Sequence, residues 1–562
     1  MGLIRTPHAA VIVWNYDDRV SVDGITNSFD KVNELIISTV SLMSISTYKS
    51  KGDPVGNFNF MLAPTRNWTS VLTPGSWCAI LMADTPLDKS SFQKAKHDQV
   101  KMLGRIDTVR VDVSVDSDGA RSTRYIVAGR DWGSIFSNIV YVDPLVQDPS
   151  DQGKTMANAL YQQFSQNVFS ANNDVLKLTV PKNLQTILSV FGGPIKLPET
   201  ERLAKATHDI SLPSGVSNYF NFVDGLNTES KSTSITKLLN LVWGPLKNED
   251  DYDNSSPDAT GTGWLDPGAM TGQHPLWSIL QENCNHAMNE LYPEIRWIHE
   301  NPQLRLYARI KPFSYTNTPA APDQIDPQMR SMFQNIYTHK LDDESIINVN
   351  AGTNWADKYN FLEIKADINE LQVLGMLLKA RSQAYQGTNS TSEVFDREGF
   401  RPIIFSIRQL PFNVQSAKDP LNADLISKWV HLAKEWYFDS HKLLNGTIVL
   451  TGRGHYIPVG DNIMFDAGLI GVTPNYNSGS PKKDPIYVLG HVETVQNNFS
   501  ISADGDRSFQ TIIQFVRGIF VDAQKRLIGE GTIDTLASAL SKNDSKNNVS
   551  VLSVPHYTPG EE

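Results

Sequence analysis

Two stretches of this chain read almost alike: G-R-I-D-T-V-R at residues 104–110 and G-H-V-E-T-V-Q at residues 490–496. Three of the seven positions are identical, and the other four are chemically similar or polar in both copies. An Asp-Gly pair follows each stretch at the same distance, at 118–119 and at 504–505. A segment containing Pro and Gly also precedes each copy at nearly the same distance. The sequence therefore indicates a module that occurs twice in one chain.

The repeated module has the pattern of β-structure. Apolar and polar residues alternate over 109–116, which is the period of a strand with one buried face. Four valines would form that buried face: Val109, Val111, Val113 and Val115. The Asp-Gly turn and the apolar stretch 124–130 complete a hairpin, and residues 486–518 repeat this plan. We expect the two seven-residue stretches to lie on equivalent strands of two similar barrels or tightly bent sheets.

The composition is that of a folded protein with more than one domain. The chain has 562 residues, and single hydrophobic cores stop growing near about 250–300 residues. The net charge of −11 and the lack of a Lys/Arg-rich run argue against a protein that reads nucleic acid. Cys78 and Cys284 stand in apolar contexts and are expected to be buried thiols. No signal peptide and no apolar run of about 20 residues is found, which predicts no membrane insertion by this chain.

The order of patterns predicts an α+β fold, in which two similar β-barrel-like tube modules are separated by a helical insertion and a small α/β domain. We expect six segments: a first β tube module at 1–135, a helical and irregular insertion at 136–262, a small α/β domain at 263–330, connecting strands and a helix at 331–400, a long helix with the second β tube module at 401–525, and a C-terminal tail at 526–562.

Three local predictions concern the segments between the two modules. Apolar residues recur at helical spacing over 276–291, which predicts a helix there. Residues 294–310 are expected to form a hairpin. The clearest helical pattern of the chain covers 419–444.

The sequence assigns no catalytic, cofactor-binding or metal-binding residues, so we expect a protein that is not an enzyme. The G-R-G run at 452–454 precedes a strand pattern rather than a helix, which excludes a dinucleotide-binding loop. His431 and Glu435 stand one helical turn apart, but such a pair is far more often exposed than bound to a metal.

The acidic runs and the tryptophans are further candidates for functional residues. The acidic runs at 250–251 and 342–344 contain the carboxylates that a glycosidase needs, but both stand in polar segments and are expected to be solvated loops. Most tryptophans occur within apolar periodic patterns and are expected in the core. Trp264 and Trp355 stand in polar segments rich in Gly, Asp or Asn and are candidates for interface contacts.

Three stretches resemble the central baseplate hub proteins of contractile-tailed bacteriophages, a family related to the hub part of type VI secretion spikes. Residues 275–313 resemble the family's helix with a Trp-x-x-Leu start, its Asn-Glu-Leu turn and a strand ending at a basic-Pro-Phe corner. Residues 342–364 resemble an isoleucine-rich strand, a connecting segment N-A-G-T-N-W-A-D-K-Y-N-F and a further strand. Residues 443–518 resemble the closing β module, with an Asn-Gly-Thr strand start and a terminal Arg-Gly. The resemblance is weak over 136–262.

This resemblance implies a structural protein in the tail baseplate of a virion, assembled in the cytoplasm of the host bacterium. Such hubs are homotrimers with two tube-like modules per chain, so that six modules form a pseudo-sixfold ring. One face of the ring continues the tail tube and the other receives a threefold central spike. The implied partners are the tail tube protein, the spike protein and other baseplate proteins, with the tape measure protein as a further candidate. Genome DNA would pass through the channel during ejection without specific binding.

Other classes stay open from the sequence. A tail-associated peptidoglycan hydrolase is the enzyme alternative, and the lack of a catalytic set argues against it. A carbohydrate- or receptor-binding tail protein would lie at the tail periphery instead of on the axis. The hub of a tail-like bacteriocin or secretion system is a variant that the sequence does not separate from a phage hub. The negative net charge predicts a neutral to acidic channel wall, because each Lys/Arg–phosphate contact strengthens binding to DNA.

Overall fold

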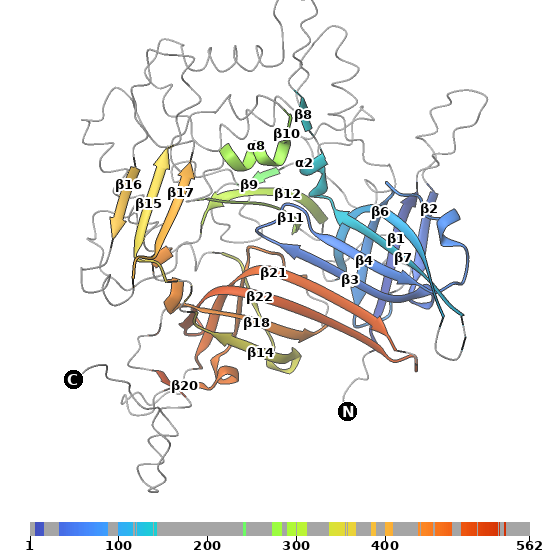
Figure 1. Ribbon diagram of the computed structural model, residues 1–562. Coiled ribbons are helices and arrows are strands. Elements are labelled where there is room, and N and C mark those ends of the chain that lie inside the picture. The colour runs from blue at the N-terminus through green and yellow to red at the C-terminus, as the bar shows by residue number, and fades with distance from the viewer. Residues whose placement is uncertain are drawn as a thin grey trace, which may run out of the picture.

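Two similar arrays of strands form one continuous thirteen-stranded sheet in the computed structural model of the chain (Figure 1). The structure describes residues 6–15, 33–87, 99–115, 119, 121–138, 140–142, 240–242, 273–283, 289–298, 301–311, 336–354, 356, 358–366, 384–388, 399–407, 437–438, 440–452, 456–474, 485–502, 504–525, 528 and 533–535. Strands dominate this part of the chain, which contains two short α-helices, α2 (Ser134–Asn138) and α8 (Leu276–Asn283). Neither described helix has the length or the apolar run that crossing a membrane requires.

The first array is the N-terminal one, drawn in blue and cyan in Figure 1. Its strands bury one face, as β4 illustrates: Phe58, Phe60 and Leu62 are buried while Asn57 and Asn59 are exposed. Two short 3-10 helices, η2 (Thr39–Ser41) and η3 (Trp68–Ser70), connect parts of the array. The seven strands are β1 (His8–Asn15), β2 (Asn33–Ser38), β3 (Leu42–Ser50), β4 (Asn57–Leu62), β5 (Trp77–Ala83), β6 (Val100–Val115) and β7 (Arg121–Asp131).

The second array is formed by residues from the last two fifths of the chain. The six strands are β13 (Thr338–Lys340), β14 (Ile346–Gly352), β18 (Leu444–Thr451), β19 (Asn462–Asp466), β21 (Tyr487–Ile501) and β22 (Arg507–Val521). Three 3-10 helices accompany them: η6 (Asp343–Ser345), η9 (Ser440–Lys442) and η10 (Ala467–Ile470).

The two arrays have the same strand order. In the first, neighbouring strands follow the order β3-β4-β7-β6-β5-β1, and in the second the order β14-β18-β22-β21-β19-β13. The stretch 104–110 lies on β6 and the stretch 490–496 on β21, so the two similar stretches occupy equivalent strands as the sequence predicted. One direction differs, since β1 is antiparallel to β5 whereas β13 is parallel to β19.

Two pairs of β-bulges occur at matching positions of the repeat. The register of β6 with β7 skips Asp107, and the register of β21 with β22 skips Glu493, which is the equivalent residue of the second copy. The register of β3 with β4 skips Met43, and that of β14 with β18 skips Ile347. A bulge adds one residue to a strand and is a position-specific feature of a sheet. The matched bulges fix a residue-by-residue correspondence between the arrays.

The turn before each repeated stretch is also matched. Gly75 has φ +91° and Gly460 has φ +83°, a backbone conformation in which a side chain is strained. The Gly75 N–H donates to the Ile106 carbonyl oxygen at 2.6 Å, and the Gly460 N–H donates to the Val492 carbonyl oxygen at 2.9 Å. The likeness seen in sequence is therefore a likeness of backbone geometry.

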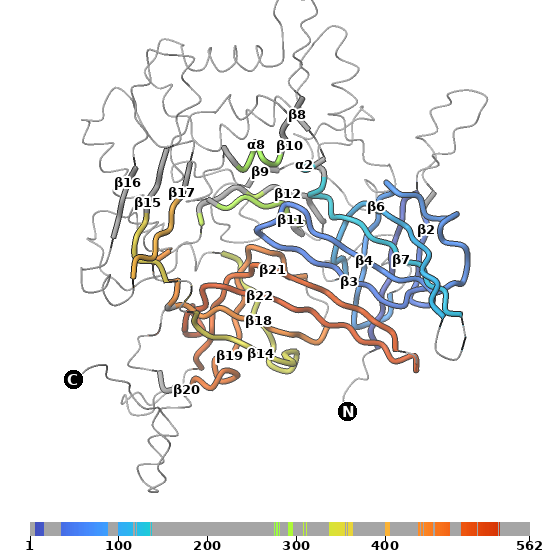
Figure 2. The backbone as a smooth tube through the Cα atoms, in the orientation of Figure 1, coloured from blue at the N-terminus to red at the C-terminus, as the bar shows by residue number. Residues whose placement is uncertain are grey.

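Pairing of β3 with β21 joins the two arrays into one sheet (Figure 2). Seven residue pairs connect them, from Thr494 opposite Ser50 to Ser500 opposite Ser44. The core of the first array includes Phe499 and Phe509 from the second array, so the hydrophobic interior is shared across the joint. The two arrays are thus parts of one packed unit.

Smaller sheets and helices lie beside the main sheet. The hairpin of β11 (Asn289–Ile298) and β12 (Asn301–Ile310), with β9 (Asn240–Val242), contributes Tyr292 and Tyr307 to the core of the second array. A three-stranded sheet consists of β15 (Phe361–Ala366), β16 (Ala384–Thr388) and β17 (Pro402–Ile407). Two strand pairs complete the described elements: β8 (Val140–Val142) with β10 (Gln273–Pro275), and β20 (Val472–Pro474) with β23 (Ile533–Thr535).

The predicted α+β class is only partly correct, because the described part of the chain is mostly β-sheet. Most of the predicted helical insertion at 136–262 and most of the predicted helix at 419–444 lie outside the described residues. The predicted hairpin at 294–310 is confirmed by β11 and β12. The helix predicted over 276–291 is too long at its end, since α8 ends at Asn283 and Leu291 lies on β11. Short apolar runs fit a helix and a strand equally well, which explains this error.

Residues 109–115 lie on a strand, β6, as predicted, but the prediction that its valine face is buried is wrong. Val111, Val113 and Val115 are 47%, 56% and 63% exposed. Beyond Asp107, β6 pairs with β7 alone among the described strands, and this half of the hairpin continues past the core. Periodicity identifies the residues that share a face but not what covers that face.

The matched glycines give a test of the repeat. Replacing Gly75 by Ala should lower the free energy of unfolding by roughly 1–2 kcal/mol, because its φ is positive and the nearest atom to a new Cβ is Arg105 Nη2 at 3.7 Å. Gly460→Ala should cost about 1–3 kcal/mol more, because its Cβ would lie 2.1 Å from Tyr292 Oη. Denaturant unfolding of both variants measures the difference. Equal losses would contradict the close packing of the hairpin on the second array.

Candidate functional site

A cluster of charged side chains, buried except for the half-buried Glu493, lies where the first array, the second array and the β11–β12 hairpin meet. We call this cluster the junction; it consists of Lys49, Lys51, Asp131, Glu290, Glu294 and Glu493. Its two lysines come from the end of β3 and the residue after it, at the point where β3 is paired with β21. Burying charges is costly unless they are paired and hydrogen-bonded, so the partners of each group decide what the junction does.

Lys51 connects three elements. Its Nζ lies 3.0 Å from Glu290 Oε2 on β11 and 2.9 Å from Glu493 Oε2 on β21. Its backbone N–H donates to the Glu493 carbonyl oxygen at 2.8 Å. Burial alone would lower the pKa of the Lys51 ammonium, but the two carboxylates outweigh burial and raise that pKa above its usual value. Lys51 therefore stays charged at neutral pH and holds the hairpin and both arrays together.

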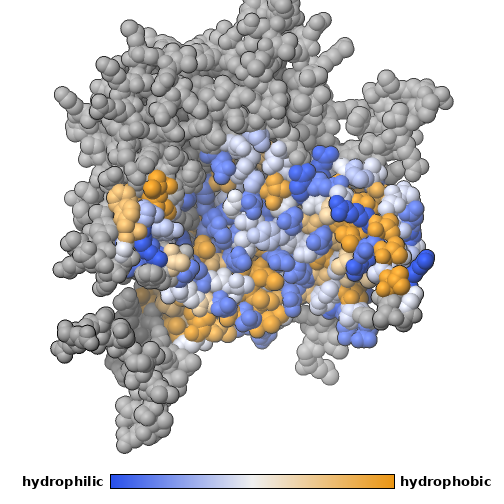
Figure 3. Space-filling model, in the orientation of Figure 1, coloured by the Kyte–Doolittle hydropathy of each residue, from blue (hydrophilic) through white to orange (hydrophobic). Residues whose placement is uncertain are grey.

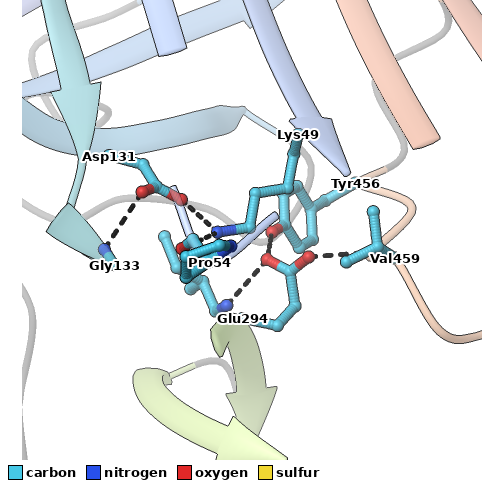
Figure 4. Close-up of polar contacts among 8 residues, drawn as sticks. Lys49, Pro54, Asp131, Gly133, Glu294, Tyr456 and Val459 are labelled. Atoms are coloured by element: carbon cyan, nitrogen blue, oxygen red, sulfur yellow. Dashed lines mark hydrogen bonds and ion pairs between the residues drawn. The ribbon is translucent and has the colours of Figure 1, made fainter. Parts of the chain in front are cut away.

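Lys49 forms an ion pair with the Asp131 carboxylate, and its Nζ lies 3.5 Å from the Pro54 carbonyl oxygen (Figure 4). The other Asp131 oxygen accepts a hydrogen bond from the Gly133 N–H at 3.0 Å. Burial raises the pKa of the Asp131 carboxyl, and Lys49 and the backbone donors offset part of that rise. This contact fixes the end of β7 against β3 inside the first array.

Glu294 on β11 connects the hairpin to the segment that leads into β19. Its Oε2 accepts from the Val459 N–H at 3.0 Å, and its Oε1 accepts from the Tyr456 hydroxyl and, at 2.8 Å, from the Ile295 N–H (Figure 4). Burial raises the pKa of the Glu294 carboxyl, while Lys49 and these donors act in the opposite direction. All three hydrogen bonds position backbone and side chains, and none leaves the carboxylate open to a substrate.

A small cavity lies among these groups. Its volume is about 20 Å³, and its lining includes Lys49, Lys101, Asp131, Glu294 and Tyr456. A cavity of this size has room for about one water molecule. The junction can therefore fix the relative position of three elements, but it has no space for a substrate or cofactor.

Lys311 lies at the end of β12 in contact with Tyr437. Its Nζ donates to the Tyr437 hydroxyl at 2.7 Å and lies 5.1 Å from the centre of the tyrosine ring. Burial, and next the charge of Lys51, lower the pKa of Lys311 to about 8. Burial also raises the pKa of the Tyr437 hydroxyl. The Lys311 charge is thus sensitive to mildly alkaline pH.

The two copies of the repeat differ where the hairpin covers only one of them. His491 is buried, with Nδ1 2.9 Å from Asn462 Oδ1 and Nε2 3.7 Å from Glu290 Oε2. The equivalent residue of the first copy is Arg105, which is half-buried and lies over the Trp77 ring at 5.8 Å. His therefore takes the place of Arg in the copy of the repeat where β11 brings a carboxylate, Glu290, close to this position.

The sequence candidates are distributed as follows. Asp342, Asp343 and Glu344 are exposed at the turn around η6, as expected for a solvated loop. Cys78 is a buried thiol, as predicted. Among the described residues, no group of three His, Cys, Asp or Glu side chains could hold a metal ion. The remaining candidates lie outside the described residues: Asp250, Asp251, Trp264, Cys284, Trp355, His431 and Glu435.

Sequence reasoning missed the junction. Its members come from four strands, β3 with the residue after it, β7, β11 and β21, and no local spacing brings them together. One signal was present: Lys49, Glu290 and Glu294 stand within stretches that otherwise read as strands with buried apolar residues. A charged residue at an inward strand position is rare unless it is paired, so such positions mark buried ion pairs.

The two bulge carboxylates allow a matched test of the junction. Glu493 pairs with the buried Lys51, whereas its equivalent Asp107 pairs with Arg130, whose side chain is 41% exposed. Lys51→Ala should cost about 3–5 kcal/mol of unfolding free energy, because it leaves the buried Glu290 carboxylate without its cation. Arg130→Ala should cost under about 1 kcal/mol, as for exposed pairs. Similar losses in denaturant unfolding would contradict the role given to Lys51.

The lowered pKa of Lys311 predicts a pH dependence of stability. Between pH 8 and 10.5 the unfolded chain holds the Lys311 proton more firmly than the folded chain does, since the folded pKa is about 8 and the ordinary value is 10.5. The contribution of Lys311 to the free energy of unfolding should therefore rise with pH across that window. The unfolding free energy of the natural chain minus that of Lys311→Met should increase from pH 8 to 10.5. A difference that stays flat or falls contradicts the burial of this ammonium.

No protein-family model and no curated protein matches the chain. Among solved structures, the chain is similar to a tail protein from Neisseria meningitidis MC58, with a TM-score of 0.38 and 11% identity over 91% of this chain and 96% of that one. It is also similar to the 43 kDa tail protein of prophage MuSo2 from Shewanella oneidensis, with a TM-score of 0.37 and 10% identity over 91% and 98%. A Francisella PdpA-VgrG complex in its lidded form gives a TM-score of 0.34 and 9% identity over 92% and 54%. Two of these three structures are tail proteins, in agreement with the resemblance inferred from the sequence.

Proposed function

We propose that this chain is a structural hub of a phage tail baseplate. Three chains form a ring on the tail axis, which joins the sixfold tail tube to a threefold central spike and leaves a channel for DNA. The observation that carries the proposal is the structural duplication: two arrays of equal strand order with two matched pairs of bulges, joined edge to edge in one sheet.

The duplication supports a trimer because of symmetry. Closed homo-oligomers repeat each surface once per chain. Three chains with two similar arrays therefore present six similar surfaces, which suits a partner made of six equal subunits such as the tail tube protein. The β11–β12 hairpin and the β15–β17 sheet occur once per described chain and would keep threefold character for a spike protein.

The junction supports a role in which the angle between the arrays is fixed. Lys51 and its two carboxylates connect both arrays to the hairpin, and the two hydrophobic cores meet at the β3–β21 joint. A chain that must set the geometry of a ring needs rigid joints between its modules. An enzyme needs an accessible pocket with reactive groups, and the junction cavity has room for about one water molecule.

Mass measurement of the purified, assembled protein tests the proposal. The expected particle contains three chains, and labelling in intact particles should place it on the tail axis between tube and spike. A ring of six chains, or a monomer at the tail periphery, contradicts the proposal. Cell-wall hydrolysis by the pure chain that a single substitution abolishes would favour the hydrolase alternative instead.

A further inference from the structure

We propose that the Lys49 and Asp131 side chains condense to an amide, which joins β3 to the end of β7 by a covalent bond. The reaction needs no substrate or cofactor, because both reacting groups belong to this chain. It goes beyond the proposed function and does not depend on it. Three observations carry the proposal: the contact between the two groups, their burial, and the polar groups arranged around them.

The fold brings the amine and the carboxyl group together. Lys49 Nζ forms an ion pair with Asp131 Oδ2, and Figure 4 shows the two side chains pointing toward one another. The two residues are 82 positions apart in sequence. Tyr48 and Arg130 both lie opposite Asn57 on β4, so the residues that follow them meet at the same end of the sheet. Two reactants held in contact react within one molecule, which removes the entropy cost of their encounter.

Both reacting groups are withdrawn from solvent. Hydrophilic side chains are usual at the surface, and Figure 3 shows many of them among apolar ones on the face that it draws. The Lys49 and Asp131 side chains are instead 10% and 3% exposed. Burial disfavours charged groups and raises the pKa of the Asp131 carboxyl. Proton transfer within the pair gives an amine and a carboxylic acid, which are the forms that condense.

Backbone groups hold the Asp131 carboxyl in the orientation that an attack by Lys49 requires. The Gly133 N–H donates to Oδ1 at 3.0 Å, whereas Oδ2 contacts Lys49. Negative charge develops on Oδ1 when Nζ attacks Cγ, and a backbone N–H aimed at that oxygen stabilises this charge. A Cβ on Gly56 would lie 3.0 Å from both Asp131 Oδ2 and Lys49 Cδ, so the chain closes tightly over the pair.

Glu294 provides a carboxyl group that can relay protons. It is 3% exposed, and burial raises the pKa of its carboxyl while the nearby charge of Lys49 acts in the opposite direction. The Tyr456 hydroxyl donates to its Oε1 and fixes its position (Figure 4). A positioned carboxyl that burial helps to keep protonated can give a proton to a leaving oxygen and take one from the attacking nitrogen.

The junction cavity adjoins all three groups. Lys49, Asp131 and Glu294 line it, and its volume of about 20 Å³ has room for about one water molecule. Condensation releases one water molecule, so the product of the reaction fits this space. Proton transfer through one water molecule also connects Glu294 with the reacting atoms.

The reaction balances without any other reactant. One proton moves from the Lys49 ammonium to the Asp131 carboxylate. The Nζ lone pair forms a bond to Cγ, and the bond between Cγ and Oδ2 breaks. Oδ2 leaves as water, with one proton from the acid and one from the nitrogen. Nothing is oxidised or reduced, and the ion pair becomes an uncharged amide, which relieves the cost of two buried charges.

Lys51 serves as an internal control, because a lysine that contacts a carboxylate does not by itself condense. Its Nζ lies 3.0 Å from Glu290 and 2.9 Å from Glu493. Burial lowers the pKa of Lys51, but the two carboxylates outweigh burial and raise that pKa above its usual value. The ammonium therefore keeps its proton and has no lone pair for an attack. We expect no amide at Lys51.

The amide would strengthen the strand on which the joint between the arrays depends. It links the two strands that flank β4, and β3 is also the strand that pairs with β21. A covalent link between residues far apart in sequence restricts the unfolded chain and so favours the folded one. The first array would then resist unfolding from this end even when its hydrogen bonds break.

Mass spectrometry of the purified full-length chain tests the proposal. The expected mass is that of the sequence minus one water molecule, and proteolysis should give a branched peptide in which Lys49 is joined to Asp131. Lys49→Arg keeps a cation beside Asp131 but has no amine, so it should have its full mass. A folded natural chain of full mass, with residues 49 and 131 in separate peptides, overturns the proposal.

The leaving group gives an independent check. In Asp131→Asn a nitrogen takes the place of Oδ2, so condensation should release ammonia instead of water. Loss of water that persists in this variant or in Lys49→Arg comes from another reaction, such as cyclisation at an Asp-Gly pair, and contradicts the proposal. A branched peptide at Lys51 instead of Lys49 contradicts it as well.

A time course separates the role of Glu294 from a purely structural one. Glu294→Gln keeps the size of the side chain and can still accept hydrogen bonds, but it cannot relay a proton. After cell-free synthesis, the amide should form at least about tenfold more slowly in this variant than in the natural chain. Circular dichroism of both chains should show the same fold. Equal rates of amide formation would contradict the role assigned to Glu294.

Discussion

The pairing of β3 with β21 is the contact on which the other features of this structure depend. It turns two arrays that are far apart in sequence into one sheet and lets their cores merge around Phe499 and Ile45. It also brings Lys51 to the bulge at Glu493, where the β11–β12 hairpin adds Glu290. This pairing is what places Lys51 beside Glu493. The sheet joint and the ion cluster therefore stabilise each other at one place.

The duplication explains both the likeness and the differences of the arrays. Features that depend only on the strand itself are kept in both copies, such as the bulges and the positive-φ glycines Gly75 and Gly460. Features that depend on neighbours differ. Arg105 is half-buried over an aromatic ring, whereas its equivalent His491 is buried beside Glu290. The same contrast separates the covered Phe499 from the exposed Val113. Each difference identifies a neighbour that one copy has and the other lacks.

Much of the β-structure could be predicted from sequence, because alternation and turn residues act locally. The repeat, the strands β6 and β21 and the β11–β12 hairpin all followed from such patterns. The exposure of Val111 to Val115 could not, since a strand pattern does not reveal what covers its apolar face. The end of α8 and the strand character of Leu291 were missed because a short apolar run fits two periods. The junction was missed because its charges meet through tertiary structure, and only their inward positions gave a signal.

A fixed angle between two equivalent arrays suits the proposed function, in which the chain acts by setting the geometry of a ring. The most direct measurement is electron cryo-microscopy of the assembled particle, reconstructed without imposed symmetry. The account predicts three chains in a ring in which first and second arrays alternate. A ring in which like arrays are neighbours, or a ring of six chains, would contradict it.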